Sequence, residues 1–306
     1  SLTGALAAGS LKREHIELAA ARQLSTQIRL ALRARPNPPA DVVASVKHRR
    51  LAREAARRAA VLVRNQFSDG VAALPLAASL SRVALLGPLA DARNQGDVGS
   101  SMVSPPESVT ILDGLRERLG NRLIHVGGTD QAEAVAAARG ADAAVVVVGL
   151  SSVDEGESMI GVDTASTQLL GGIARFRVVA AAMVRLAARV ATLKKFGGDR
   201  RDLRLHAEDI ALIRAVAKVN ARTVVVVIGG GTIVLDPWDT DVAAVLLAWY
   251  PGMEGGRAVA DVLLGDAEPA GRLPMAIPRR QNDLPQVDWD AATATYGRWL
   301  GQRKLD

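Results

Sequence analysis

With 306 residues, 49% of them hydrophobic, the chain can bury a sizeable core, and because only 3% are aromatic that core must be aliphatic. The net charge of +6 comes from 38 basic residues spread along the chain beside 32 acidic ones, which does not give the concentrated basic stripe typical of a nucleic-acid partner. The sequence has no cysteine, which excludes disulfides, thiolate catalysis and cysteine-ligated zinc. The four histidines lack metal-ligand spacing, so we expect no metal and no cofactor. The longest apolar runs are about as long as a strand, and we expect neither a membrane-spanning helix nor a membrane partner.

Two helical patterns open the chain. Apolar residues recur at helical spacing over residues 11–35, and the proline-rich segment 35–39 then ends the helix and indicates a linker. A second helix is predicted over residues 41–63, with arginines on one side and Leu, Ala and Val on the other.

From residue 82 onward, short apolar runs alternate with amphipathic stretches. The runs predict strands at residues 83–86, 123–126, 143–148, 223–228 and 244–249, and the stretches predict helices near residues 110–119, 131–139, 207–219 and 256–264. Strands without polar alternation are buried on both faces, so the pattern predicts an α/β sandwich: a mostly parallel open sheet with helices on both faces. Ligands of such sheets bind beyond the carboxyl ends of the strands, and we therefore expect a site in the loops after these runs.

Residues 164–196 interrupt this alternation with six basic residues, no acidic residue and one apolar helical face. A helical insertion over residues 158–196 that packs its apolar side on the domain accounts for the pattern, because a single stripe needs only a neighbouring surface. A membrane-surface or partner-binding helix is the alternative.

The loop after the first strand of the alternation contains Asp97, Ser100 and Ser101 among several glycines. These side chains could bind hydroxyl groups, and an ordinary turn-rich connection is the favoured interpretation of this stretch alone. A phosphate loop is a weaker rival, because the loop lacks the Walker spacing. Gly127-Gly128 and Gly229-Gly230-Gly231 follow later strands, and neither completes the dinucleotide fingerprint.

The loop after the third strand is acidic, with Asp154, Glu155 and Glu157 within four residues. Crowding of like charges at the end of a buried strand raises the pKa of at least one carboxyl group, which suits a general acid. A solvated acidic loop is an equally good interpretation of these residues alone.

The last third of the chain predicts a strand end at Trp249-Tyr250, a helix after the paired Gly255-Gly256, and a turn with a final strand within residues 270–278. Trp249 and Tyr250 could stack on a sugar, but packing against the end of the sheet is the favoured interpretation.

Five ordered motifs together give the chain a family resemblance. They are the helix and following segment from His48 to Asn65, the loops at residues 87–101, the stretch 148–157, the segment Gly198-Asp199-Arg200 with Leu203 and Leu205, and the block 249–278. Over residues 48–306 the chain resembles the C-terminal α/β sandwich domain of glycoside hydrolase family 3, the β-glucosidase and β-xylosidase family. Any one motif is weak, whereas five in the right order are specific.

The resemblance implies four regions. Residues 1–35 resemble the end of the TIM-like barrel domain that precedes the sandwich in this family, and residues 36–80 are a linker and connecting helix. Residues 81–285 are the sandwich with its insertion, and residues 286–306 are a C-terminal tail. None of the barrel strands is in this sequence.

The resemblance also assigns chemistry. Retaining glycosidases use one nucleophilic and one acid/base carboxyl group. In this family the nucleophile belongs to the barrel and the acid/base to the loop after the third sandwich strand. Glu155 matches that position best and Glu157 second, although Ser158-Met159 stand where many members have Asp-Arg. The loop that holds Asp97, Ser100 and Ser101 would line the leaving-group side of the site.

We therefore expect a glycoside hydrolase domain that supplies the acid/base for a β-linked oligosaccharide or an aryl or alkyl β-glycoside. The alternative is a catalytically inactive fragment that binds carbohydrate or acts structurally. The expected protein partner is a barrel domain in cis or in trans, or a second copy through self-association. Any signal would precede Ser1, so localisation is unknown, with the cytoplasm slightly favoured.

Overall fold

The computed structural model describes residues 2–33, 36, 38–68, 70–93, 96, 103–156, 200, 202–284, 288, 291–293 and 295. By their internal contacts, the residues form two compact units, Ser1–Ser45 and Val46–Asp306. The helical insertion predicted over residues 158–196 lies outside the described residues.

The first unit is helical. It contains α1 (Leu2–Ala7) and α2 (Arg13–Leu32), and neither helix buries any residue. Leu24, Ile28 and Leu32 of α2 are among the exposed large apolar side chains. These two helices therefore present apolar surface that their own unit does not cover.

The second unit begins with α3 (Val46–Ala59), followed by the elements of a sandwich. The remaining strands and longer helices are β1 (Val61–Asn65), β2 (Phe67–Ser68), β3 (Val71–Ala72), β4 (Val83–Leu86), α4 (Ile111–Leu119), β5 (Leu123–Val126), α5 (Gln131–Arg139), β6 (Ala143–Gly149), α6 (Ser152–Glu155), α9 (Ala207–Ala217), β7 (Thr223–Ile228), β8 (Ala244–Leu247) and α10 (Gly255–Leu264). β2 and β3 form a separate two-stranded sheet. Among the helices of the described part of the chain, none combines the length and apolarity needed to cross a bilayer.

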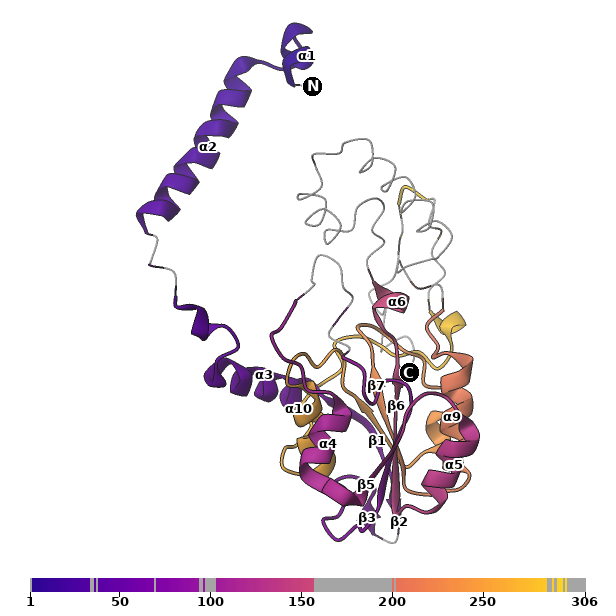
Figure 1. Ribbon diagram of the computed structural model, residues 1–306. Coiled ribbons are helices and arrows are strands. Elements are labelled where there is room, and N and C mark those ends of the chain that lie inside the picture. Colours follow the sequence, from indigo (N-terminus) through magenta and orange to yellow (C-terminus); the bar gives the residue numbers. More distant parts are fainter. Residues whose placement is uncertain are drawn as a thin grey trace, which may run out of the picture. The chain divides into compact units, whose positions relative to one another are not determined.

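The main sheet has the strand order β1-β8-β7-β6-β4-β5. It lies between α4 and α10 on one side and α5 and α9 on the other (Figure 1). All neighbouring strands are parallel except β1, which pairs antiparallel with β8. β4, β6, β7 and β8 are buried along their whole length, because helices cover both faces. The sequence prediction of a mostly parallel α/β sandwich is confirmed.

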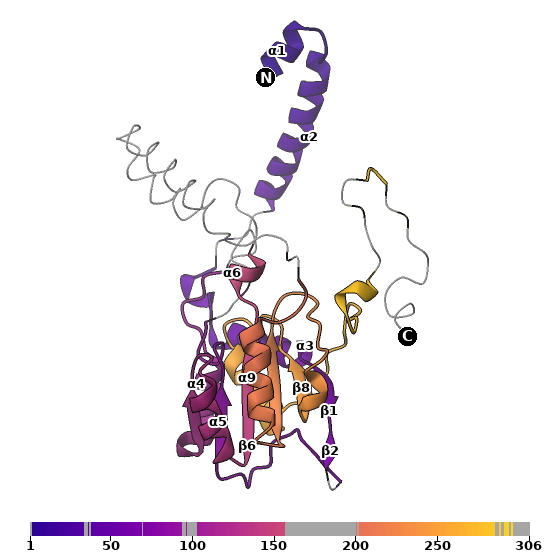
Figure 2. The same ribbon diagram turned by 90° about the vertical axis from the view of Figure 1, so that its right-hand side faces the viewer.

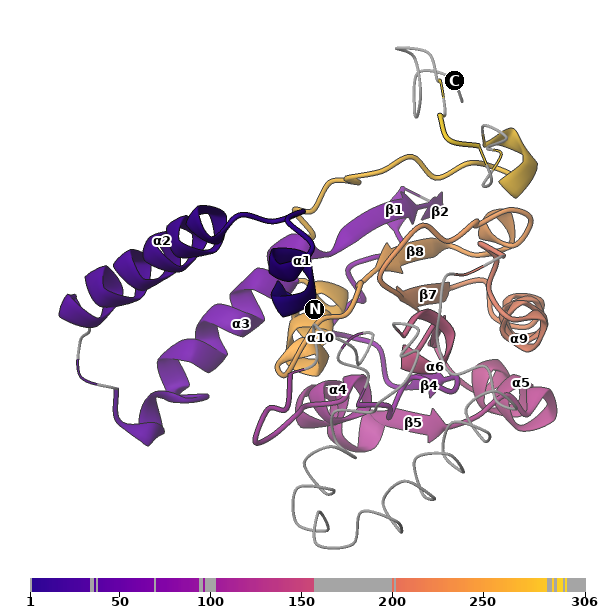
Figure 3. The same cartoon turned by 90° about the horizontal axis from the view of Figure 1, so that it is seen from above.

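Alternate residues of the strands enter two different core layers. Leu85, Val145 and Val147 pack on the side of α4 and α10, whereas Leu86, Val146 and Val148 pack on the side of α5 and α9. Figure 2 shows α5 and α9 side by side over one face, and Figure 3 shows the two helix layers from above. The valine-rich runs therefore form strands because both faces of the pleat need apolar side chains.

Two expectations about secondary structure are wrong. The helix predicted through residue 63 ends at Ala59, and Val61–Asn65 forms the edge strand β1 on β8. Its β-branched residues Val61 and Val63 suit a strand, and β8 offers unpaired backbone groups there. The final strand predicted within residues 270–278 does not form, since Pro274 and Pro278 lack the amide hydrogens that a ladder requires.

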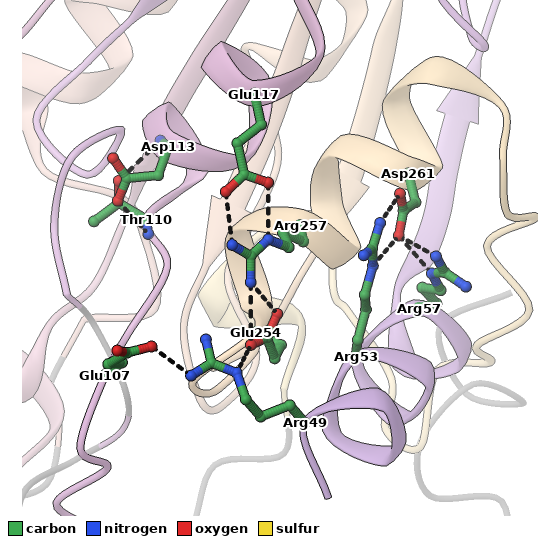
Figure 4. A network of polar contacts seen from close by, with 10 residues as sticks. All are labelled: Arg49, Arg53, Arg57, Glu107, Thr110, Asp113, Glu117, Glu254, Arg257 and Asp261. Atoms are coloured by element: carbon green, nitrogen blue, oxygen red, sulfur yellow. Dashed lines mark hydrogen bonds and ion pairs between the residues drawn. The ribbon is translucent and has the colours of Figure 1, made fainter. Parts of the chain in front are cut away.

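Helix α3 is tied to α10 by arginines that reach two buried carboxylates (Figure 4). Arg53 Nε and Arg57 Nε each donate to Asp261 Oδ2 at 2.6 Å, and Arg49 Nε donates to Glu254 Oε1 at 2.6 Å. Burial raises the pKa of Asp261, but the hydrogen bonds and charges of Arg53 and Arg57 lower it more, so the net pKa lies below the ordinary carboxyl value. The helix that precedes β1 is therefore an integral part of the sandwich unit.

Candidate active site

Three parallel strands bring their following loops together at one edge of the sheet. α6 comes after β6, the glycine turn 229–231 comes after β7, and Trp249 and Tyr250 come after β8. The ends of β6 and β7 lie in register, with Gly149 opposite Ile228, and a Cβ at Gly149 would collide with the Ile228 backbone. A glycine at this position lets the chain leave β6 close beside β7.

The short helix α6 is fixed at its start by a capping box. Asp154 Oδ2 accepts hydrogen bonds from the Ser151 amide at 2.8 Å and from the Ser151 hydroxyl at 3.0 Å. Asp154 Oδ1 lies 3.0 Å from Nε2 of His206, the residue that precedes α9. Asp154 therefore holds the acidic loop against its own cap and against α9.

Glu155 is held by donors from three other segments. Oε2 accepts from the Gly230 amide and from the Tyr250 hydroxyl, each at 2.6 Å, and Oε1 lies 3.0 Å from Arg200 Nε. Only 10% of the Glu155 side chain is exposed. The carboxylate thus joins the end of α6 to the ends of β7 and β8 and to the segment at residue 200.

Arg200 completes this arrangement from the segment that leads into α9. Its Nη2 donates to the carbonyl of Thr232 at 2.9 Å, which ties the guanidinium to the turn after β7. Its Nη1 is buried with no hydrogen-bond partner among the described residues. These contacts join the chain at Arg200 to the turn after β7 and to the end of α6.

A second buried carboxyl group lies beneath the acidic loop. Burial raises the pKa of Asp209 to about 6, although His206 and the Gly149 amide act in the opposite direction. The side chain is only 3% exposed, and its α-helix, α9, packs over β6. The loop therefore rests on a group that changes charge in mildly acidic solution.

Of the predicted site residues, the structure describes Glu155 alone. Glu155 has the contacts given above, whereas Asp97, Ser100, Ser101 and Glu157 lie outside the described residues. The sequence reasoning missed the Tyr250 hydroxyl and the Gly230 amide as partners of Glu155. Their positions directly after apolar runs were the available signal, because parallel strands end at one edge of the sheet.

Within the described ranges, no group of three or more acidic or histidine side chains is placed so that it could hold a metal ion. Glu155 and Asp154 are each occupied by nitrogen or hydroxyl donors. The chemistry that these residues can offer is proton transfer and hydrogen bonding.

An α/β sandwich that gathers partly buried carboxylates at the carboxyl ends of its parallel strands belongs to the class of domain that binds ligands at that edge of the sheet. The chain belongs to glycoside hydrolase family 3, since residues 60–302 match the family model described as the Glycosyl hydrolase family 3 C-terminal domain.

Individual relatives agree with this membership. A periplasmic β-glucosidase of Salmonella typhimurium is 28% identical over 254 residues, which are 81% of this chain and 31% of the relative. A β-xylosidase of Formosa agariphila is 28% identical over 255 residues, which are 78% of this chain and 29% of the relative. The chain thus spans less than a third of the length of these two proteins.

Solved structures show the same likeness. A family 3 β-glucosidase of Bifidobacterium adolescentis superposes with a TM-score of 0.68 at 25% identity, covering 95% of this chain and 38% of that one. A β-glucosidase of Erythrobacter marinus gives a TM-score of 0.71 at 25% identity, with 93% and 38% covered.

Proposed function

We propose that this chain supplies the general acid/base of a retaining, β-glucosidase-like glycosidase, with Glu155 in that role and Glu157 as the alternative residue. The nucleophile would belong to a barrel domain that acts with it in cis or in trans. The substrate class is a β-linked oligosaccharide or an aryl or alkyl β-glycoside. Membership of the family supports the class of reaction, and the geometry around Glu155 supports the residue.

The chemistry needs one carboxyl group that gives and then takes a proton. Protonated Glu155 would transfer its proton to the glycosidic oxygen while the nucleophile forms the covalent glycosyl-enzyme and the aglycone leaves. The carboxylate would then remove a proton from water, whose oxygen attacks the sugar and releases the nucleophile. The two carboxyl groups stand roughly 5–5.5 Å apart in retaining enzymes, so the loop must be held accurately.

The observation that carries the proposal is the position of Glu155. It ends α6, directly beyond the central strand β6, at the edge where loops of three parallel strands meet. Three donors fix its carboxylate in place, which meets the demand for an accurately held catalytic group. Asp154, its neighbour, is engaged with its own cap and with His206.

A second function rests on the same contacts. Both oxygens of Glu155 are engaged within the domain, Oε2 by two hydrogen bonds and Oε1 by the ion pair with Arg200, as the carboxylate of a purely structural ion pair would be. In that case Glu155 anchors the loop, and the chain either presents Glu157 as the acid or serves as an inactive carbohydrate-binding or structural domain.

A fusion protein tests the proposal. The N-terminal part of the Bifidobacterium adolescentis β-glucosidase would precede residues 46–306 of this chain, in place of its own C-terminal part. We expect the fusion to hydrolyse an aryl β-glucoside and the isolated chain to show no turnover. Equal turnover by the isolated chain would contradict a nucleophile on a separate barrel. A fusion that binds the glycoside but does not cleave it would favour the second function.

A further inference from the structure

The turn after β7 consists of three glycines, and its shape depends on the Glu155 carboxyl group. A Cβ at Gly230 would lie 2.9 Å from Tyr250 Cε2 and 3.4 Å from Glu155 Oε2. A Cβ at Gly231 would lie 2.9 Å from Arg200 Nη2. The glycines therefore allow the backbone to approach a carboxylate, an aromatic ring and a guanidinium, and the Gly230 amide donates to Oε2.

Tyr250 differs chemically from the other two partners of Glu155. The Gly230 amide and the Arg200 guanidinium can only donate hydrogen bonds, so they satisfy only lone pairs of the carboxyl group. A phenol hydroxyl both donates and accepts, so its bond with Oε2 persists when that oxygen carries a proton. Tyr250 is thus the partner that can keep the carboxyl group in place through both protonation states.

Trp249 sets the position of Tyr250. Its φ is +56°, a left-handed conformation that is uncommon for a bulky residue. Its indole Nε1 donates to the carbonyl of Ala59, the last residue of α3, at 2.9 Å. This bond fixes the end of β8 to the end of α3, and the next residue turns its hydroxyl onto Glu155.

We infer that Arg200, Gly230 and Tyr250 form a carboxyl seat that fixes Glu155 and the acidic loop, with Tyr250 as its positioning residue. The seat itself is inferred from the contacts of Glu155, and only the acid/base task of Glu155 rests on the proposed function. The seat explains why Gly229-Gly230-Gly231 follows β7, although these glycines do not complete a dinucleotide-binding fingerprint.

The seat can be observed in the intact chain by NMR. The sequence has two tyrosines, so labelling the Cζ carbon of tyrosine gives two signals, and Tyr296→Phe assigns them. A phenol that donates to a carboxylate has its Cζ signal displaced downfield. We expect this displacement for Tyr250 and its reduction in Glu155→Gln, because an amide oxygen is a weaker acceptor than a carboxylate. The matched control is Glu117→Gln, which removes the charge of a different arginine-bound glutamate and should leave the Tyr250 signal unchanged.

The amide of Gly230 gives a second measurement. We expect its hydrogen exchange to become about tenfold faster in Tyr250→Phe, because the carboxylate that accepts from it loses one hydrogen bond. Gly230→Ala should displace the Tyr250 signal, whereas Gly127→Ala, whose added methyl meets only ordinary contacts, should not. Identical Tyr250 signals in wild type and Glu155→Gln, with unchanged Gly230 exchange in Tyr250→Phe, would overturn the seat. A Glu155→Gln fusion that keeps its activity would overturn the role of Glu155 as acid/base and leave the seat intact.

Discussion

Asp154 and Glu155 are adjacent in the chain, yet their carboxylates are held by different parts of the domain. Asp154 contacts Ser151 and His206, and Glu155 contacts Arg200 and the ends of two strands. Donors and cations therefore compensate each charge separately. The sequence predicts crowded like charges in this loop. In the structure the Asp154 carboxylate caps α6, and the Glu155 carboxylate joins the loops after β7 and β8.

Asp209 makes the stability of the domain depend on pH. Its pKa is about 6 in the folded protein and 3.8 is the ordinary value, so between these pH values the folded state binds more protons than the unfolded state. The stabilisation from protonated Asp209 is therefore complete at low pH and is lost as the pH rises towards 6. We expect the free energy of unfolding of wild type, relative to Asp209→Asn, to be about 2 kcal/mol higher at pH 4.5 than at pH 7.

Urea unfolding of both proteins at the two pH values measures this difference. Glu208→Gln, a substitution at an exposed carboxyl of the same helix whose charge is a minor cause of the raised Asp209 pKa, is the control and should show a much smaller difference. A pH-independent gap between wild type and Asp209→Asn would show that Asp209 does not titrate in this range. His206 and Asp154 face the same region, and comparison with the variant cancels their contribution as long as their contacts persist.

Helix α3 depends on buried acceptors for its attachment. Asp261 is 1% exposed and receives Arg53, Arg57 and Arg118. We expect Asp261→Asn to lower the free energy of unfolding by about 3 kcal/mol, because partly buried guanidinium groups lose their charged partner. Glu117→Gln removes a half-exposed partner of Arg257 and should cost below about 1 kcal/mol. Equal losses in the two variants, measured by urea unfolding, would contradict an attachment centred on Asp261.

The sequence predicts elements well where one local pattern suffices. The valine runs of β6 and β7 need apolar neighbours on both faces, and both strands occur where the runs predict them. β1 depends on the exposed edge of β8, a partner almost two hundred residues away, so helical spacing misled the prediction there. The contacts of Glu155 also depend on partners that are distant in sequence, since Tyr250 and Gly230 are 95 and 75 residues away.

The position of Glu155 could be predicted from the sequence, whereas its hydrogen-bond donors could not. The order of strands and loops predicts Glu155 at the carboxyl edge of the parallel strands, where it lies, and the family resemblance implies a chemical task for that loop. Which donors surround the carboxyl group could not be predicted, because this depends on side-chain directions in three loops. Asp209 illustrates the same limit: its burial follows from the packing of α9 on β6, which helical spacing alone does not specify.

The first unit has exposed apolar side chains on its helices. Neither α1 nor α2 buries a residue, and Leu24, Ile28 and Leu32 are exposed. We expect light scattering to show self-association of residues 1–306 that decreases when residues 1–45 are removed, because apolar surface that is in contact with water favours association. Monodisperse monomers of both lengths would show that this surface does not drive association.

Azide rescue tests the role of Glu155 most directly. In the fusion protein, Glu155→Ala removes the group that activates water, so the glycosyl-enzyme of an activated aryl β-glucoside should accumulate. Azide needs no general base and should restore turnover with formation of the β-glycosyl azide, while Glu157→Ala should keep its rate without azide. Near-normal hydrolysis by Glu155→Ala, or rescue of Glu157→Ala in its place, would contradict the assignment of Glu155 as the acid/base.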